Sequence, residues 1–132
     1  MKVRAAGFDA FYGLEIDELT PEHARGRLVV RAEHRQPRGI VHGGVYASIA
    51  EGLTSWATRA VVVERGLSTS GMSNQTSFLR PISDGTIHAV ATRRHAGRTT
   101  WVWEVEFSDD EGRLCALSRM TIAIREPPAP PR

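Results

Sequence analysis

The pattern of hydrophobic and polar positions follows the period of a helix over one long stretch, residues 45–63. Apolar side chains recur there every three or four residues, which is the spacing of one helix face. The members of this row are Val45, Ile49, Leu53, Trp56, Ala60 and Val63. Gly66 follows the row at the place where a glycine commonly ends a helix. The pattern predicts one helix of about 19 residues, roughly 28 Å long, with this row packed against a core.

A second row on the same predicted helix carries small polar side chains and a single carboxylate. Its members are Ser48, Glu51, Ser55 and Thr58. The outer face of a helix normally carries long charged residues that face solvent. We therefore expect this row to leave room for another molecule to approach Glu51.

Most of the remaining chain alternates with the period of two that is typical of strands. The clearest case is the stretch 99–108, where Trp101, Trp103, Val105 and Phe107 fall on one face. Gly, Pro, Asp and Asn mark the turns between such stretches. The strands are predicted over residues 13–19, 25–32, 68–79, 86–93, 99–108 and 113–125. The first two form a hairpin, and the last three pair antiparallel because their short connections cannot hold crossover helices.

A sheet with one apolar face needs a cover, and only the predicted helix is long enough to provide it. The order β-β-α-β-β-β-β therefore predicts an α+β protein in which a curved antiparallel sheet wraps around one long central helix. This architecture is the hotdog fold. We expect residues 1–126 to form a single domain and the proline-rich residues 127–132 to be disordered.

Composition narrows the class of protein. A chain of 132 residues, with 41% hydrophobic and 24% charged residues, is typical of one soluble globular domain. It has no apolar run long enough to span a membrane and no apolar signal core at its start, so we expect a cytoplasmic location. The net charge of +2 is too balanced for general nucleic-acid binding. The single cysteine, Cys115, excludes an intrachain disulfide and a multi-cysteine zinc site, and we expect it to be a packing residue.

The stretch 36–44 carries the candidate chemistry, because it brings a histidine and two glycines to the start of the helix. The first amides of a helix have no partner within it, and this end of the helix dipole is positive. Gly43 and Gly44 let a ligand oxygen reach these amides, such as a carbonyl that becomes an oxyanion during acyl transfer. Glu51, two turns later, is a candidate nucleophile or general base. Signatures of serine hydrolases, zinc proteases and dinucleotide-binding proteins are missing from the sequence.

The spacing of Gln36, the triplet His42-Gly43-Gly44 and Glu51 resembles that of the hotdog-fold acyl-CoA thioesterases. Within that family, the sequence resembles the group that contains the phenylacetate-pathway, 4-hydroxybenzoyl-CoA and 1,4-dihydroxy-2-naphthoyl-CoA thioesterases. The similarity continues through residues 74–81, 95–98 and 110–115 and covers about residues 13–125.

This resemblance implies roles for five residues. Gly43 N–H would polarise the thioester carbonyl, and Gln36 and His42 would position the thioester. Glu51, from the neighbouring subunit of a dimer, would attack the carbonyl or activate water. Ser55 would hydrogen-bond in the acyl pocket or orient that water. His42 has a simpler alternative role as a cap of the helix.

The resemblance also implies a substrate and an assembly. The substrate is an acyl-CoA, no cofactor or metal is expected, and the active unit is a homodimer that commonly pairs into a homotetramer. The residues expected to contact the acyl group or coenzyme A are Gly44, Asn74, Phe78, Arg80, Arg94, His95, Gly97 and Arg98. The residues expected to line a pocket suited to aromatic or medium-chain acyl groups are Trp56, Met72, Phe78 and Leu79.

Three questions stay open at this point. The sequence does not give the acyl group, and it leaves Glu51 as either nucleophile or general base. A hotdog enoyl-CoA hydratase or dehydratase would share the fold, and a non-catalytic acyl-CoA-binding protein would share both the fold and the ligand.

Overall fold

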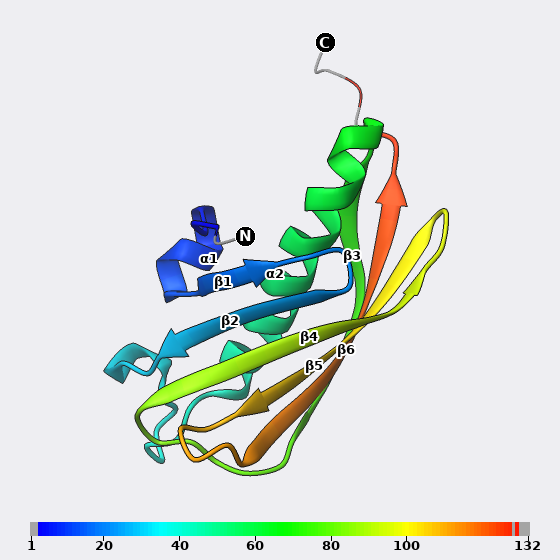
Figure 1. Ribbon diagram of the computed structural model, residues 1–132. Helices are drawn as coiled ribbons and strands as arrows, with labels where there is room; N and C mark the ends of the chain where they lie inside the picture. Colours follow the sequence, from blue (N-terminus) through cyan, green and yellow to red (C-terminus); the bar gives the residue numbers. More distant parts are fainter. Residues whose placement is uncertain (1–2, 128, 130–132) are drawn as a thin grey trace.

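The computed structural model describes residues 3–127 and 129, and they form one six-stranded antiparallel sheet wrapped around a long helix (Figure 1). The chain begins with a short helix, α1 (Gly7–Tyr12), and a hairpin of β1 (Glu15–Leu19) and β2 (His23–Val29). A 3₁₀ turn, η1 (Ala32–His34), precedes the central helix α2 (Gly43–Val62), which runs into a second 3₁₀ turn, η2 (Val63–Arg65). The other strands are β3 (Ser68–Phe78), β4 (Thr86–Ala96), β5 (Thr100–Ser108) and β6 (Leu114–Arg125).

The sheet has the strand order β1-β2-β4-β5-β6-β3, and every neighbouring pair is antiparallel. The predicted hairpin and the predicted pairing of the last three strands are confirmed, and so is the hotdog fold. β3 pairs with β6 and not with its sequence neighbour β4, so it forms a free edge of the sheet. Most of the tail predicted to be disordered, residues 127–132, lies outside the described residues.

The predicted boundaries hold to within a few residues. β2 lies two to three residues earlier than predicted because residues 32–34 form the turn η1. The His34 side chain closes this turn, since its Nδ1 accepts a hydrogen bond from the Arg31 N–H at 2.9 Å. β4 continues to Ala96, three residues beyond the predicted end, because its far end still pairs with β5.

The two predicted faces of α2 need a correction. Ile49 and Leu53 are fully buried as expected, but Ala60 and Val63 are exposed. The buried face is turned toward Tyr46, Ala50, Ala57 and Val62. Thr58, predicted to belong to the small polar row, is fully buried in the core. Its hydroxyl accepts a hydrogen bond from Trp103 Nε1 at 2.9 Å and donates to the Thr54 carbonyl, so the polar group is satisfied inside the core.

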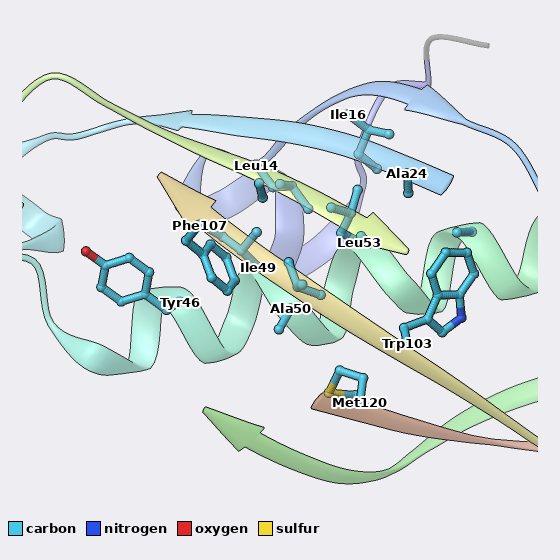
Figure 2. Close-up of a cluster of buried hydrophobic side chains, with 14 of the residues drawn as sticks. Leu14, Ile16, Ala24, Tyr46, Ile49, Ala50, Leu53, Trp103, Phe107 and Met120 are labelled. Atoms are coloured by element: carbon cyan, nitrogen blue, oxygen red, sulfur yellow. The ribbon is translucent and has the colours of Figure 1, made fainter. Parts of the chain in front are cut away.

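The core lies between α2 and the inner face of the sheet. Trp101, Trp103, Val105 and Phe107 of β5 are all buried, as their alternation predicts. Figure 2 shows Trp103 and Phe107 facing Ile49, Ala50 and Leu53 of the helix, with Met120 of β6 beside them. None of the helices in the described part of the chain is long and apolar enough to cross a lipid bilayer.

The loop before α2 is held in place from two sides. The backbone N–H of Val41 donates to the Ile82 carbonyl at 2.8 Å, and that of His42 donates to the His34 carbonyl at 2.8 Å. Gly39 has a φ of +89°, a left-handed conformation that favours glycine. The start of α2 is therefore fixed to the rest of the fold by backbone hydrogen bonds.

Candidate active site

The first turn of α2 is capped by the side chain of His42. His42 is the N-cap residue, and its Nδ1 accepts a hydrogen bond from the Gly44 N–H at 2.8 Å. The His42 carbonyl accepts from the Val45 N–H at 3.0 Å. Within residues 3–127 and 129, no acceptor contacts the Gly43 N–H. The capping role considered for His42 is therefore present, and it leaves the Gly43 N–H as the donor available to a ligand.

Gln36 lies in the tight turn that precedes the helix. Its backbone N–H donates to the Ile40 carbonyl at 2.8 Å, and its side-chain Oε1 accepts a hydrogen bond from the Arg38 N–H. Because Oε1 is engaged within the turn, the side-chain amide nitrogen is the group of Gln36 that remains as a donor. Gln36 thus adds a second donor near the start of α2.

Gln36 and Gly43 line a cavity of about 390 Å³, here called the Gly43 cavity. The apolar or weakly polar members of its wall are Ile40, Val41, Tyr46, Phe78, Leu79, Pro81 and Cys115, and its strongly polar members are Gln36, Arg38 and Arg80. A Cβ added at Gly43 would lie 2.8 Å from the Phe78 ring, so any other residue at this position would require the ring to move. The predicted residues Phe78, Leu79 and Arg80 therefore gather around the free amide.

Glu51 lines a different cavity of about 410 Å³, here called the Glu51 cavity. Its wall is formed by Phe8, Asp9, Ala47, Ser48, Glu51, Gly52, Ser55 and Asn74. Asn74 joins β3 to α2, since its Nδ2 donates to the Ala47 carbonyl at 2.8 Å. The expectation that Ser48, Glu51 and Ser55 share one accessible face is met, whereas Thr58 is not part of it.

The carboxylate of Glu51 lies against the free edge of the sheet. A Cβ placed on Gly71 of β3 would be 3.5 Å from Glu51 Cδ. The pairing of β3 with β6 shifts register between Gly71 and Ser73, and the side chain of Met72 in between is 57% exposed. Glu51 therefore faces the part of β3 that has no neighbouring strand on one side.

Gly43 and Glu51 do not meet in one chain. They are eight residues apart on one helix, which is about 12 Å along its axis. Their contacts on β3 are Phe78 and Gly71, which lie roughly 23 Å apart along a strand of ordinary rise. A carbonyl bound to the Gly43 amide is thus out of reach of the same chain's Glu51.

Four other predicted residues lie at the opposite end of the sheet from Gly43. Arg94, His95, Gly97 and Arg98 belong to the β4–β5 hairpin, beside the start of β3 and the end of β6 (Figure 1). Arg94 pairs with Glu104 at 3.1 Å on the surface, and a Cβ at Gly97 would lie 2.7 Å from His95 Nε2. Within one chain these residues are not brought together with the Gly43 cavity.

Two residues in the cavity walls were not singled out by the sequence. Asp9 of α1 lies across Gly52, where an added Cβ would be within 3 Å of its carboxyl group. Its two oxygens accept hydrogen bonds from Tyr12 OH at 2.9 Å and Trp56 Nε1 at 3.1 Å. Burial, followed by the charge of Asp9, raises the pKa of Tyr12 well above its usual value, so this hydroxyl stays a donor. A glycine in the middle of a helix is the sequence signal of such a close approach.

Tyr46 is the second residue that the sequence did not single out. It is 4% exposed and lines the Gly43 cavity. Burial, with a smaller effect from Cys115, raises the pKa of Tyr46 to about 12, so its hydroxyl is protonated at neutral pH. Cys115 is buried in the same wall, and burial raises the pKa of its thiol, as suits a packing residue.

Among the residues that the structure describes, no group of three or more His, Cys, Asp or Glu side chains lies close enough to hold a metal ion. The Gly43 cavity is lined by backbone and side-chain donors, and the Glu51 cavity by two carboxylates together with Ser48, Ser55 and Asn74.

The fold and these cavities define a hotdog protein with a free helix amide at one site and a carboxylate at another. The model of the thioesterase superfamily matches residues 38–116, which include Gly43, Glu51 and the cavity wall from β3. The chain belongs to this superfamily, and it is an enzyme that hydrolyses acyl thioesters.

Three relatives illustrate the similarity. The protein Rv1847 of Mycobacterium tuberculosis is 38% identical over 117 residues, which cover 87% of this chain and 84% of that protein. Its solved structure has a TM-score of 0.87 and covers 92% of this chain and 98% of the other. The proofreading thioesterase EntH of Cronobacter turicensis is 31% identical over 112 residues, covering 85% of this chain and 81% of that enzyme. A structure of a mutant of the thioesterase PA1618 of Pseudomonas aeruginosa has a TM-score of 0.86 at 28% identity, covering 90% and 86% of the two chains.

Proposed function

We propose that this protein hydrolyses an acyl-CoA thioester to a carboxylic acid and free coenzyme A, in a homodimer whose active sites each use residues of both subunits. The observation that carries the proposal is the Gly43 N–H, which has no acceptor among residues 3–127 and 129 and which the His42 cap leaves available. A thioester carbonyl oxygen placed there accepts this hydrogen bond and is stabilised as negative charge develops on it. Gln36 adds a donor beside it.

Glu51 supplies the second half of the chemistry, from the partner subunit. It either attacks the carbonyl carbon or takes a proton from the water that attacks it. In both routes the C–S bond breaks, coenzyme A leaves as a thiolate that takes up a proton, and the oxygen of water ends in the carboxylic acid. Two observations support a contribution across subunits: Gly43 and Glu51 line separate cavities, and the Glu51 carboxylate lies against the unpaired edge strand β3.

The edge strand also supports the placement of coenzyme A. If two copies of β3 pair antiparallel, the end of the sheet that carries the β4–β5 hairpin in one subunit meets the Gly43 end of the other. Arg94, His95, Gly97 and Arg98 then approach the partner's Gly43 cavity, where Arg38 and Arg80 already lie. Arginine is well suited to the phosphates of coenzyme A because its guanidinium donates two parallel hydrogen bonds.

The test is an assay of thiol release from a panel of aromatic and aliphatic acyl-CoA compounds. Glu51→Ala should lower kcat by two or more orders of magnitude, and Gln36→Ala should have a smaller effect because Gln36 positions the thioester. Glu64→Ala is the matched control, since Glu64 is exposed in η2, beyond the end of α2. Cys115 is 1% exposed and therefore adds little background to a thiol assay.

Two outcomes would contradict this function. A Glu51→Ala enzyme with nearly wild-type kcat would exclude the proposed mechanism. Tight binding of acyl-CoA with no thiol release across the panel would identify a binding protein, and loss of the double bond of an enoyl-CoA would identify a hydratase. His42 is poorly suited to act as such a histidine base, since its Nδ1 is engaged as the helix cap.

A further inference from the structure

Tyr46 stands out because its hydroxyl is buried without a partner. The residue is 4% exposed, and no hydrogen-bond donor or acceptor within the described part of the chain contacts its hydroxyl. It is the one buried side-chain polar atom in this condition across residues 3–127 and 129. Buried tyrosine hydroxyls normally find a partner, and leaving one unpaired destabilises the fold.

Other buried polar side chains of this protein are satisfied. Trp103 donates to Thr58, and the buried His34 uses both ring nitrogens in hydrogen bonds to the backbone. The half-buried Trp56 donates to Asp9. Tyr12, at 8% exposed, is a tyrosine in a comparable setting, and its hydroxyl donates to Asp9 at 2.9 Å. The unpaired hydroxyl of Tyr46 is therefore an exception within a well-satisfied core.

The position of this hydroxyl connects it with the Gly43 cavity. Tyr46 follows Gly43 by three residues, so both lie on one face of α2, and a helical side chain leans toward the helix N-terminus. The Tyr46 ring contacts Phe107 edge-on at 5.4 Å between centroids and Phe78 at 6.0 Å. Figure 2 shows its hydroxyl directed away from the other labelled core side chains. Tyr46 itself lines the cavity, together with Gly43 and Phe78.

The surroundings of the hydroxyl limit what it can bind. The wall of the Gly43 cavity contains the apolar side chains of Val41, Phe78 and Leu79 and the buried thiol of Cys115. It also contains the polar residues Gln36, Arg38 and Arg80. The apolar part of such a wall accepts an apolar group, and the phenol then offers it a single directed hydrogen bond. Because burial raises the pKa of Tyr46 to about 12, its phenol keeps a proton at neutral pH that it can donate to an oxygen of the ligand.

We propose that Tyr46 is a specificity-determining residue of the Gly43 cavity and that its hydroxyl donates a hydrogen bond to an oxygen atom carried by the acyl group, beyond the thioester carbonyl. The proposal rests on the function proposed above, since it takes the Gly43 N–H as the place of the thioester carbonyl. The substrate class is then an apolar acyl group with one ether, keto or hydroxyl oxygen, held between Phe78 and the first turn of α2.

Matched substrate pairs distinguish the effect of this hydrogen bond on kcat/KM from the effect of substrate shape. Methoxybenzoyl-CoA and ethylbenzoyl-CoA differ by an oxygen in place of a methylene group, and each is prepared as the ortho, meta and para isomer. An ω-methoxyalkanoyl-CoA and the alkanoyl-CoA of equal chain length form the aliphatic pair. The wild-type enzyme should prefer the oxygen-containing member of at least one pair by about tenfold in kcat/KM, which is the size expected for one neutral hydrogen bond in a buried site.

Tyr46→Phe removes the hydroxyl and keeps the ring between Phe78 and Phe107. In this variant the preference should fall to within about twofold, because kcat/KM falls for the oxygen-containing substrate and stays nearly constant for its partner. Tyr46→Phe should also have a melting temperature equal to or above that of the wild type, since no hydrogen bond of the free protein is lost. Tyr12→Phe is the matched control: it should lower the melting temperature, because the bond to Asp9 is lost, and keep the wild-type preference.

The outcomes distinguish the two proposals. If the wild type hydrolyses no member of any pair or of the wider acyl-CoA panel, the proposed function fails. If it hydrolyses them without a preference in any pair, or if Tyr46→Phe changes both members of the preferred pair equally, the role of Tyr46 is wrong and the function stands. A clear fall in the melting temperature of Tyr46→Phe would also overturn the inference, since the hydroxyl would then have a structural partner.

Discussion

The division of the active site between two subunits can be tested by mixing two inactive variants. Gly43→Pro removes the amide hydrogen proposed to bind the carbonyl oxygen. Gly43 is the first residue of α2, where proline is well tolerated, and His42 has φ −64° and ψ 136°, a conformation suited to the residue before a proline. Gly43→Ala keeps the amide hydrogen and brings the same close approach of a Cβ to Phe78, so it is the control for crowding. Glu51→Ala is the second inactive variant.

The expected activities follow from the placement of Gly43 and Glu51 of each site on different subunits. Removing one oxyanion donor costs about 10²–10³ in kcat, so Gly43→Pro should be that much slower than Gly43→Ala. If each site combines Gly43 of one subunit with Glu51 of the other, a mixed dimer of Gly43→Pro and Glu51→Ala has one intact site and one doubly defective site. Random assortment makes about half of the dimers mixed, so the mixture should recover about a quarter of wild-type activity.

For the assay, the two variants carry different affinity tags. Their subunits are exchanged by mixing the variants in mild denaturant and refolding them together. Mixed dimers are isolated through both tags, and thiol release is measured before and after mixing. Each variant exchanged with itself is the control for refolding. Isolated mixed dimers with no more activity than the separate variants would refute the composite site, and a protein that is monomeric while active would refute it as well.

Two further predictions concern stability. Thr58→Val should lower the free energy of unfolding by about 1–3 kcal/mol, because it leaves the buried Trp103 N–H unpaired, while Thr58→Ser keeps the hydroxyl as a control. Thermal unfolding followed by circular dichroism measures the difference. An unchanged melting temperature for Thr58→Val would contradict the role of this bond. Asp109 accepts hydrogen bonds from the Arg113 N–H and guanidinium, which hold the pKa of its carboxyl below the usual value. A lowered pKa in the folded state means that this stabilisation is complete above about pH 4 and is lost as the pH falls through the folded-state pKa. Asp109→Asn should therefore be less stable than the wild type at pH 7 and lose less stability between pH 4 and 2 in urea titrations; equal pH dependence in both proteins would show that the turn carries no such effect.

The sheet could be predicted because its alternation is strong and its turns carry clear signals. Trp101, Trp103, Val105 and Phe107 lie on the core face as their spacing requires. The buried and exposed faces of α2 were harder to predict, because a curved sheet covers a wide arc of the helix surface. Small residues such as Ala50 and Ala57 permit close contact and leave little apolar signal in the pattern. Thr58 counts as polar in a sequence, yet its hydroxyl bonds to the preceding turn of the helix and enters the core.

Some residues of the candidate site could be predicted from the sequence and others could not. Gly43 and Glu51 could be proposed from glycine placement and from an isolated carboxylate among small residues. The contact of Asp9 with Gly52 joins positions 43 residues apart, and only the folded chain shows which acidic side chain occupies that space. Gly52 itself was a usable signal, since glycine is unfavourable inside a helix unless something approaches its backbone closely.

Tyr46 carries no such signal, and its importance follows from hydrogen-bond satisfaction alone. In a sequence it reads as one more apolar residue in the first turn of a buried helix. In the structure its hydroxyl and the Gly43 N–H are two donors without acceptors in the part of the chain described, and both belong to one cavity. The buried Trp103 and His34 side chains have hydrogen-bond partners in this fold. A purely structural role at position 46 would therefore be served by a tyrosine with a partner or by a phenylalanine. The ligand proposed above places one oxygen at the Tyr46 hydroxyl and one at the Gly43 N–H, and Tyr46→Phe removes the phenol donor while it leaves the Gly43 N–H in place.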